Sequence, residues 1–248
     1  MIPRPEELSA LLAAVGACPA HADLIHTLAW TGLREGEALG LQWGDMDFRG
    51  GFLLCRRSAY YRRKRLYVKA PKSGKGRRVD IPAALAVRLK ARRAVMEAEA
   101  AGHGREPSPW IFPDPANHAK PLDVHRFRMD VWHPLLKAVG LRAVRIHDLR
   151  HGYASLLLQR GASLTYVKDQ LGHSTIKLTV DLYGHLVPGA NRGVVEELAA
   201  LTAPGDPASE NTPAGVAAGL IDRAAKLPQA AAASWSLAGV LVARRAPD

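Results

Sequence analysis

The hydrophobic period of this 248-residue chain changes twice. Apolar residues first recur every three or four positions, then alternate with polar ones over residues 52–81, and then return to the helical spacing. The helical spacing predicts helices over residues 6–15, 21–30, 35–41, 83–101, 123–139, 147–160, 165–171, 176–183 and 194–201. We therefore predict an α+β protein, mainly α-helical, with a small antiparallel β-sheet or hairpin.

The alternating segment is also strongly basic. Residues 49–93 contain 16 Lys or Arg side chains and one acid, Asp80, in a chain whose net charge is +11. The alternation, together with the turn signal PKSGKG at 71–76, predicts one basic β-hairpin over residues 52–81. A charge run is usually a solvated face, but cations interleaved with aromatic residues favour a polyanion, first of all double-stranded DNA. The candidate DNA-binding residues are Arg62, Arg63, Lys64, Arg65, Lys69, Lys75, Arg77 and Arg78.

Composition excludes several other classes of protein. Cys18 and Cys55 are the only cysteines and lie far apart, so neither a disulfide framework nor a cysteine zinc site is expected. The N-terminal residues have two acids and no apolar core, which argues against a secretory signal. The most apolar stretch, 230–243, has 14 residues. A membrane span needs roughly 20, so we expect a cytoplasmic protein with no membrane partner.

Candidate catalytic residues gather in the segment 145–186. His147 and Arg150 are three residues apart and so share one face of a helix. His173 follows a Leu-Gly turn, and Tyr183 comes ten residues later. A lone His-x-x-Arg pair is more often an exposed pair on a helix than part of a functional site, but the four residues together indicate a functional site.

Two further candidates lie upstream. Arg34 stands at the start of a predicted helix, close behind a glycine, where backbone N–H groups point outward. Without a functional role, Arg34 would be a surface arginine paired with Glu37, one helical turn later. Lys72 lies in the predicted turn of the hairpin, between Lys69 and Lys75, and is otherwise one cation among many.

These residues together resemble the catalytic domain of tyrosine recombinases, the phage integrase family. The resemblance covers about residues 5–200 and rests on two blocks, TGLREGE followed by LQWGD, and HDLRH followed by LGHS and a tyrosine. It implies an integrase-type catalytic domain that cuts and rejoins DNA through a 3′-phosphotyrosine, without metal, nucleotide or other cofactor. It also implies DNA recombination or integration for a mobile element, by a homotetramer on DNA. The implied catalytic set is Arg34, Lys72, His147, Arg150, His173 and the nucleophile Tyr183.

The chemistry of strand cleavage suits this set. Tyr183 would attack phosphorus and retain the 3′-phosphate, which conserves the bond energy for rejoining. Arg34 and Arg150 would clamp the non-bridging oxygens with planar guanidinium groups. His147 would either take the proton of the tyrosine or hold the phosphate, and His173 would donate a hydrogen bond to the phosphate. Lys72 would protonate the departing 5′-oxygen.

Alternatives remain beside this interpretation. His147 and His151 have the i, i+4 spacing of a helical zinc half-site, but Asp148 stands where the H-E-x-x-H motif needs a glutamate. The stretch 164–183 also fits a helix-turn-helix, so the main alternative is a catalytically inactive or truncated recombinase-like DNA-binding regulator. Among the tyrosines, only Tyr183 follows L-G-H at the family's interval.

The predicted organisation is a catalytic domain over residues 1–202 and a tail over 203–248. Half of the 46 tail residues are Ala, Pro or Gly, so we expect the tail to be disordered or loosely helical. Because only 33 residues precede Arg34, we expect the N-terminal core-binding domain usual in the family to be absent. The expected setting is a bacterial or phage-encoded, nucleoid-associated protein.

Overall fold

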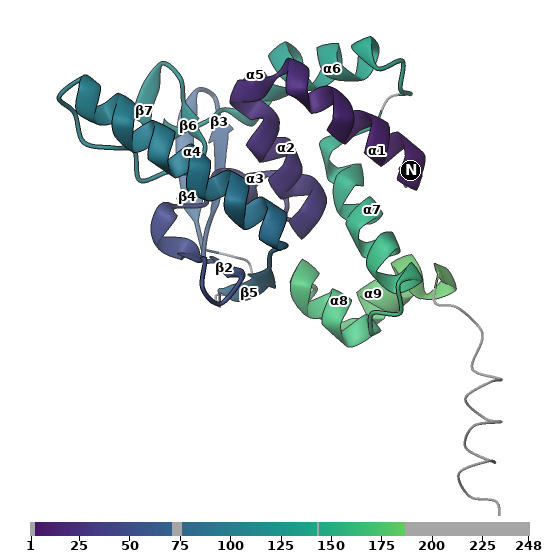
Figure 1. Ribbon diagram of the computed structural model, residues 1–248. Coiled ribbons are helices and arrows are strands. Elements are labelled where there is room, and N and C mark those ends of the chain that lie inside the picture. The colour runs from purple at the N-terminus through teal and green to yellow at the C-terminus, as the bar shows by residue number, and fades with distance from the viewer. Residues whose placement is uncertain (1–2, 71–75, 143, 187–248) are drawn as a thin grey trace, which may run out of the picture. The chain divides into compact units, whose positions relative to one another are not determined.

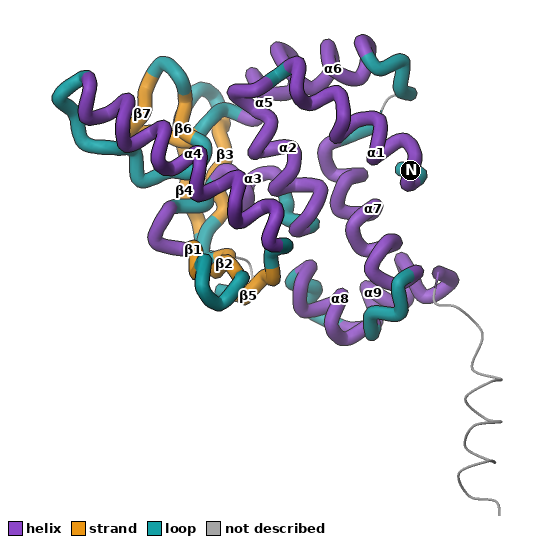
Figure 2. Tube along the Cα trace, viewed as in Figure 1, coloured by secondary structure: helices purple, strands orange, loops and turns teal. Residues whose placement is uncertain are grey.

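The computed structural model describes residues 3–70, 76–142 and 144–186. Contacts divide the chain into the units Met1–Pro188 and Gly189–Asp248, and every described residue belongs to the first. That unit combines helices with small antiparallel sheets, which confirms the predicted α+β, mainly helical class (Figures 1 and 2). The predicted helix over 194–201, the tail over 203–248, Lys72 and Lys75 lie outside the described residues.

The helices follow the predicted periods closely. They are α1 Pro5–Ala14, α2 Pro19–Thr31, α3 Glu35–Leu39, α4 Ala83–Gly102, α5 Val124–Phe127, α6 His133–Ala138, α7 Ile146–Gln159, α8 Leu164–Leu171 and α9 Ile176–Tyr183, with short 3₁₀ turns at Val15–Ala17, Trp43–Asp45 and Gly184–Leu186. Local chemistry sets several ends. The Ser163 hydroxyl accepts from the first turn of α8, Thr175 does the same for α9, and α8 ends at Gly172 with φ +65°. Within the described residues, no helix is long and apolar enough to span a bilayer.

The predicted helix over 123–139 is broken. Its middle, Arg128–Trp132, forms a wider π-type turn between α5 and α6. Pro134 stands in the first turn of α6 and has no N–H to donate back, so a regular helix cannot run through it. The helix predicted over 35–41 also ends early, at Leu39, with Gly40 as its C-cap.

The strands form three small antiparallel sheets in the described residues. They are β1 Met46–Asp47, β2 Phe52–Cys55, β3 Ser58–Arg62, β4 Arg65–Lys69, β5 Arg77–Asp80, β6 Pro113–Asp114 and β7 Asn117–Pro121. Their pairing is β1-β2-β5, β3-β4 and β6-β7. In Figure 2, α7, α8 and α9 lie on the side of the described unit away from β6 and β7, and α8 packs against β5.

The prediction of a single hairpin over 52–81 was wrong in its topology. β2 pairs with β5, and β3 pairs with β4 as a separate hairpin inserted between them. The two-residue turn of the β3–β4 hairpin is Arg63–Lys64, and both residues have positive φ, 49° and 61°. Residues 71–75 of the predicted turn PKSGKG lie outside the described residues. Alternation of residues reports that a segment is extended but not which strand is its partner, so the sequence did not resolve the two pairs.

Two apolar clusters hold the helices together. The larger one includes Leu24, Ile25 and Leu28 of α2 and Leu149 of α7. The smaller lies among α7, α8 and α9 and contains Leu158, Val167, Leu171 and the ring of Tyr183 among its buried members. The fold therefore buries the aromatic ring that ends α9 in its own small core.

Candidate active site

The turn between α2 and α3 is the point around which two arginines converge. Gly32 ends α2 with φ +60°, and a Cβ there would lie 2.4 Å from the Tyr153 ring, so both backbone and space require glycine. Its carbonyl accepts a hydrogen bond of 2.7 Å from the guanidinium of Arg150, 118 residues later in the chain. Arg34 follows two residues after Gly32, with its side chain 45% exposed. The turn thus brings Arg34 close to the buried Arg150.

The C-terminal end of α8 is held by two guanidinium groups. Arg150 donates to the carbonyl of Leu171 at 2.6 Å, and Arg77 Nε donates to the carbonyl of Gln170 at 3.0 Å. The two preceding carbonyls accept from the backbone N–H groups of the residues that follow the helix. All four carbonyls that a helix leaves unpaired at its end are therefore satisfied. Because His173 comes directly after this capped end, the same contacts fix its position.

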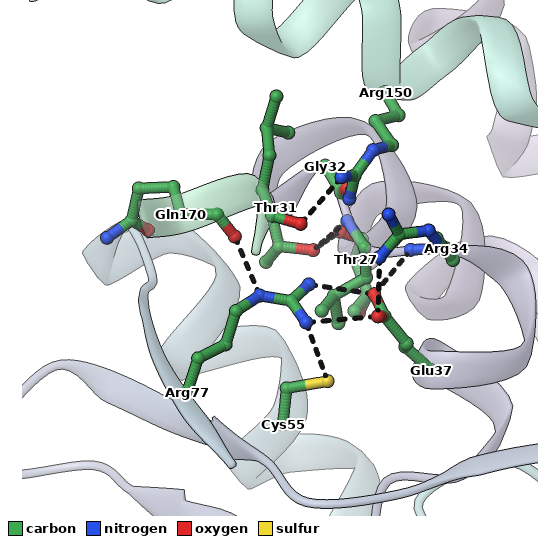
Figure 3. Close-up of polar contacts among 11 residues, drawn as sticks. Thr27, Thr31, Gly32, Arg34, Glu37, Cys55, Arg77, Arg150 and Gln170 are labelled. Carbon is green, nitrogen blue, oxygen red and sulfur yellow. Dashed lines mark hydrogen bonds and ion pairs between the residues drawn. The ribbon is translucent and has the colours of Figure 1, made fainter. Parts of the chain in front are cut away.

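Glu37 is the carboxylate at the centre of these arginines (Figure 3). One oxygen accepts from Arg34 at 3.0 Å, and Arg77 donates to both oxygens, at 3.0 and 2.7 Å. Burial acts to raise the pKa of Glu37, but the hydrogen bonds and charge of Arg77 outweigh it, and the pKa is lowered to about 2. The carboxylate therefore remains ionised and orients both arginines.

Positive charge exceeds negative charge in this cluster. Arg34, Arg77 and Arg150 face one another across a single carboxylate, and Arg150 is only 2% exposed. Burial, and then the charge of Arg34, lowers the pKa of Arg150 to about 10. A bound anion would relieve this repulsion, because an opposite charge at short range favours the ionised form. The arrangement is suited to a phosphate group.

His173 is buried beside the same charges. Its Nδ1 lies 2.9 Å from the hydroxyl of Thr179, which leaves Nε2 as the ring nitrogen available to a ligand. Burial, followed by the charges of Arg150 and Arg34, lowers the pKa of His173 to about 4. The imidazole is therefore neutral at neutral pH.

Tyr183 is the last residue of α9 and is 1% exposed. Its hydroxyl lies 2.7 Å from Nδ1 of His151, on α7. Burial raises the pKa of Tyr183, and the charge of Arg150 opposes that shift. His147, the residue predicted to assist Tyr183, is exposed and packs edge-on against the His151 ring with centroids 5.0 Å apart.

The fold brings most of the predicted catalytic residues into electrostatic contact. The charge of Arg34 lowers the pKa values of His147, Arg150 and His173, and that of Arg150 acts on Tyr183. Lys72, outside the described residues, has no assigned place. Within the described ranges, no group of three or more His, Cys, Asp or Glu side chains could hold a metal ion.

The predicted DNA-binding cations divide into two groups. Four form the tip of the β3–β4 hairpin and are exposed; we call Arg62, Arg63, Lys64 and Arg65 the hairpin tip. Lys69 is also exposed, with its ammonium over the Tyr60 ring, and Arg78 pairs with Asp80 at 3.0 Å. Arg77 differs from all of these, because its side chain is only 14% exposed and its guanidinium is held by Glu37.

The hairpin tip is unfavourable for the isolated chain. Arg63 and Lys64 occupy left-handed positions of a two-residue turn that Asn-Gly fits best, and each costs about 1 kcal/mol there. Arg62 and Arg65 face each other directly across the strands, where like charges repel. An anionic partner would reduce the charge repulsion.

Sequence reasoning missed three features of the site. Glu37 was considered only as an ordinary surface partner of Arg34, Arg77 only as a DNA-binding cation, and His151 only as half of a zinc site. The i, i+3 spacing of Arg34 and Glu37 was a usable signal, since the Glu37 carboxylate also accepts the backbone N–H of Arg34 at 2.9 Å, as in a capping box. Nothing local in the sequence marks Arg77 as buried. His151 ends the HDLRH block, but nothing there shows that it contacts Tyr183, because the partners of Arg77 and His151 lie 40 and 32 residues away.

Comparison with known proteins gives one consistent family. A model of the phage integrase family matches residues 4–188. The ICEBs1 integrase of Bacillus subtilis is 27% identical over 201 residues, which are 79% of this chain and 53% of that protein. A putative prophage phiRv2 integrase of Mycobacterium tuberculosis is 31% identical over 206 residues, 80% of this chain and 51% of that protein. The chain thus spans about half the length of these relatives.

Solved structures show the same fold. The Tn1549 transposon integrase, in complex with transposon right end DNA, is similar with a TM-score of 0.65 at 19% identity, over 80% of this chain and 66% of that one. The XerH site-specific recombinase bound to its difH substrate, in a post-cleavage complex, has a TM-score of 0.58 at 23% identity, over 80% and 52% of the two chains.

Proposed function

The chain belongs to the phage integrase family, and from that premise we propose that residues 1–202 form a catalytic domain that cuts and rejoins DNA strands. In this proposal the substrate is double-stranded DNA and the intermediate is a 3′-phosphotyrosine on Tyr183. The catalytic set is Arg34, Lys72, His147, Arg150, His173 and Tyr183. The reaction is a transesterification that needs neither a metal ion nor ATP.

The observation that carries the proposal is the excess of positive charge around Gly32. Arg150, with five N–H donors, uses one each on the carbonyls of Gly32 and Leu171. Donors remain for a phosphate, as they do on the exposed Arg34. The two guanidinium groups together supply the charge that a metal ion supplies in other phosphoryl-transfer sites.

The steps follow from these positions. The arginines bind the non-bridging oxygens and stabilise the charge that develops as Tyr183 Oη attacks phosphorus. His173, neutral at neutral pH, donates one N–H to the same phosphate. Lys72 protonates the departing 5′-oxygen. Reversal of these steps by a new 5′-hydroxyl rejoins the strand.

A nicked suicide substrate tests the proposal directly. The probe is a library of nicked duplexes with randomised flanks, from which cleavage releases a short 5′-hydroxyl fragment that cannot religate. We expect the chain to become attached to a DNA 3′-end in a complex that survives denaturing electrophoresis, in the presence of a chelator and without nucleotide. Retarded DNA with no covalent adduct would instead support the DNA-binding regulator.

The hairpin tip is proposed to contact the phosphate backbone. Replacing Arg63–Lys64 by Asn-Gly removes two cations while giving the turn its preferred residues. DNA affinity should fall, and the slope of log K against log salt should decrease by about 2, since each phosphate contact contributes about 0.9. Fluorescence anisotropy over a range of salt concentrations measures the slope.

The matched control removes two charges elsewhere. Arg105→Asn with Lys137→Asn changes residues outside the hairpin and should retain the wild-type slope. An unchanged slope for the Asn-Gly variant would show that the hairpin tip does not touch DNA.

We further propose that four copies of the chain assemble on DNA, as the family resemblance implies, and that they act on bacterial or phage DNA at the nucleoid. The DNA held by the Tn1549 and XerH proteins supports DNA as the partner.

A further inference from the structure

The hydroxyl of Tyr183 is hydrogen-bonded to a histidine that is not the expected one. His151 Nδ1 lies 2.7 Å from Tyr183 Oη, and the two rings are inclined at 53° with centroids 5.8 Å apart. His151 is one helical turn beyond His147 on α7 and directly follows Arg150. The atom that would attack phosphorus is thus already in contact with an imidazole nitrogen.

The ionisation of the pair suits a proton transfer from the phenol to the imidazole. Burial lowers the pKa of His151 below its usual value, Asp148 opposes that shift, and Arg145 and Arg150 add to it. Burial raises the pKa of Tyr183, so the phenol retains its proton at neutral pH. A neutral imidazole accepts a phenolic hydrogen at Nδ1 when its own hydrogen is on Nε2, and this tautomer of His151 is the one that proton transfer requires.

His147 is less well placed to take this proton. It is exposed, and its ring meets the edge of the His151 ring at an interplanar angle of 87°. In the described part of the chain, the side-chain hydrogen bond of Tyr183 Oη is made with His151 Nδ1. His147 therefore remains available to the phosphate, which was the other role predicted for it.

We propose that His151 is a further catalytic residue, which accepts the proton of Tyr183 as the hydroxyl attacks DNA. The proposal rests on the proposed function. The Oη–P bond forms as the P–O5′ bond breaks, the phenolic proton moves to Nδ1, and the leaving 5′-oxygen receives a proton from Lys72. In rejoining, the 5′-hydroxyl attacks phosphorus and returns its proton to Lys72, the Oη–P bond breaks, and the imidazolium of His151 returns its proton to Oη.

The first test measures adduct formation by His151→Gln, with His103→Gln as the matched control. Glutamine can still hydrogen-bond Tyr183 but cannot accept its proton. His103 is exposed at the end of α4 and is not part of the proposed site. At neutral pH the rate for His151→Gln should fall by about 10²–10⁴, the usual contribution of a general base. The control should match wild type.

Two features of that loss distinguish a base from a structural residue. The wild-type rate divided by the His151→Gln rate should decrease as pH rises, because hydroxide increasingly takes the tyrosine proton in place of the imidazole. The loss should persist on a DNA with sulfur in place of the 5′-oxygen, because that leaving group needs no acid. A rate within threefold of wild type, a loss independent of pH, or rescue by the sulfur substrate would each overturn the proposal.

A second test needs no turnover. In free protein labelled with ¹⁵N-histidine, His151 should show hydrogen on Nε2 and an accepting Nδ1, and Tyr183→Phe should change the His151 signals. Hydrogen on Nδ1, or no change in Tyr183→Phe, would overturn the proposal while leaving the proposed function standing. If wild type formed no adduct on any DNA, the proposed function would fail, and the catalytic role of His151 would fail with it.

Discussion

Tyr183→Phe is expected to abolish the covalent adduct with nicked DNA and to leave DNA binding unchanged. The substitution removes the attacking oxygen and no charge, while the ring stays in the small core among α7, α8 and α9. The cost to stability is about 1 kcal/mol for the lost hydrogen bond to His151. Denaturing electrophoresis measures the adduct, and anisotropy measures binding.

Tyr166→Phe is the matched control for this prediction. Tyr166 lies on α8, is partly exposed and donates to Asp80 at 3.0 Å. This variant should form the adduct at the wild-type rate. An adduct with Tyr183→Phe, or its loss in Tyr166→Phe, would assign the nucleophile to another residue.

Arg77→Met is expected to destabilise the fold by about 3–5 kcal/mol at neutral pH, the cost of removing one member of a buried ion pair, although Arg34 still donates to Glu37. Glu37 loses both of its hydrogen bonds from Arg77, and the end of α8 loses one of its caps. Urea unfolding followed by circular dichroism measures the loss. A cost below about 1 kcal/mol, typical of exposed ion pairs, would show that this pair contributes little to stability.

The dependence of that loss on pH follows from the ionisation of Glu37. Its pKa is lowered from 4.5 to about 2 in the folded chain, so the pair contributes its full stability above pH 4.5 and loses it as pH falls toward 2. In Arg77→Met the buried carboxyl should instead bind a proton readily. The difference in unfolding free energy between the two proteins should therefore shrink in acid.

Glu37→Gln combined with Arg77→Met completes a double-mutant cycle. Because the second change removes the unpaired charge that the first one leaves, the double variant should lose less than the sum of the single losses. Additive losses would mean that the two side chains act independently.

Helix positions and catalytic motifs could be predicted from the sequence because both are local. The range 176–183 was predicted for α9 and is observed, since apolar spacing, the Thr175 cap and the length of the segment all act over a few residues. The same holds for α7, predicted over 147–160 and observed over Ile146–Gln159. The position of Tyr183 after L-G-H was likewise readable from the linear chain.

Pairing could not be predicted in this way. The alternation over 52–81 is identical for one long hairpin and for two nested strand pairs, so the turn at Arg63–Lys64 went unrecognised. Arg77 is one of 16 cations between residues 49 and 93, and nothing near it in the sequence distinguishes the one that is buried.

By itself, then, the sequence determined which residues lie on which helices, the family of the chain and the identity of most candidate catalytic side chains. Only the tertiary structure decided that Arg77 holds Glu37, that Arg150 joins Gly32 to Leu171, and that His151 rather than His147 meets Tyr183. The physical reason is distance along the chain. Periodicity and capping act within a helical turn or two, whereas these contacts join residues 21 to 118 positions apart and form only once the cores have packed.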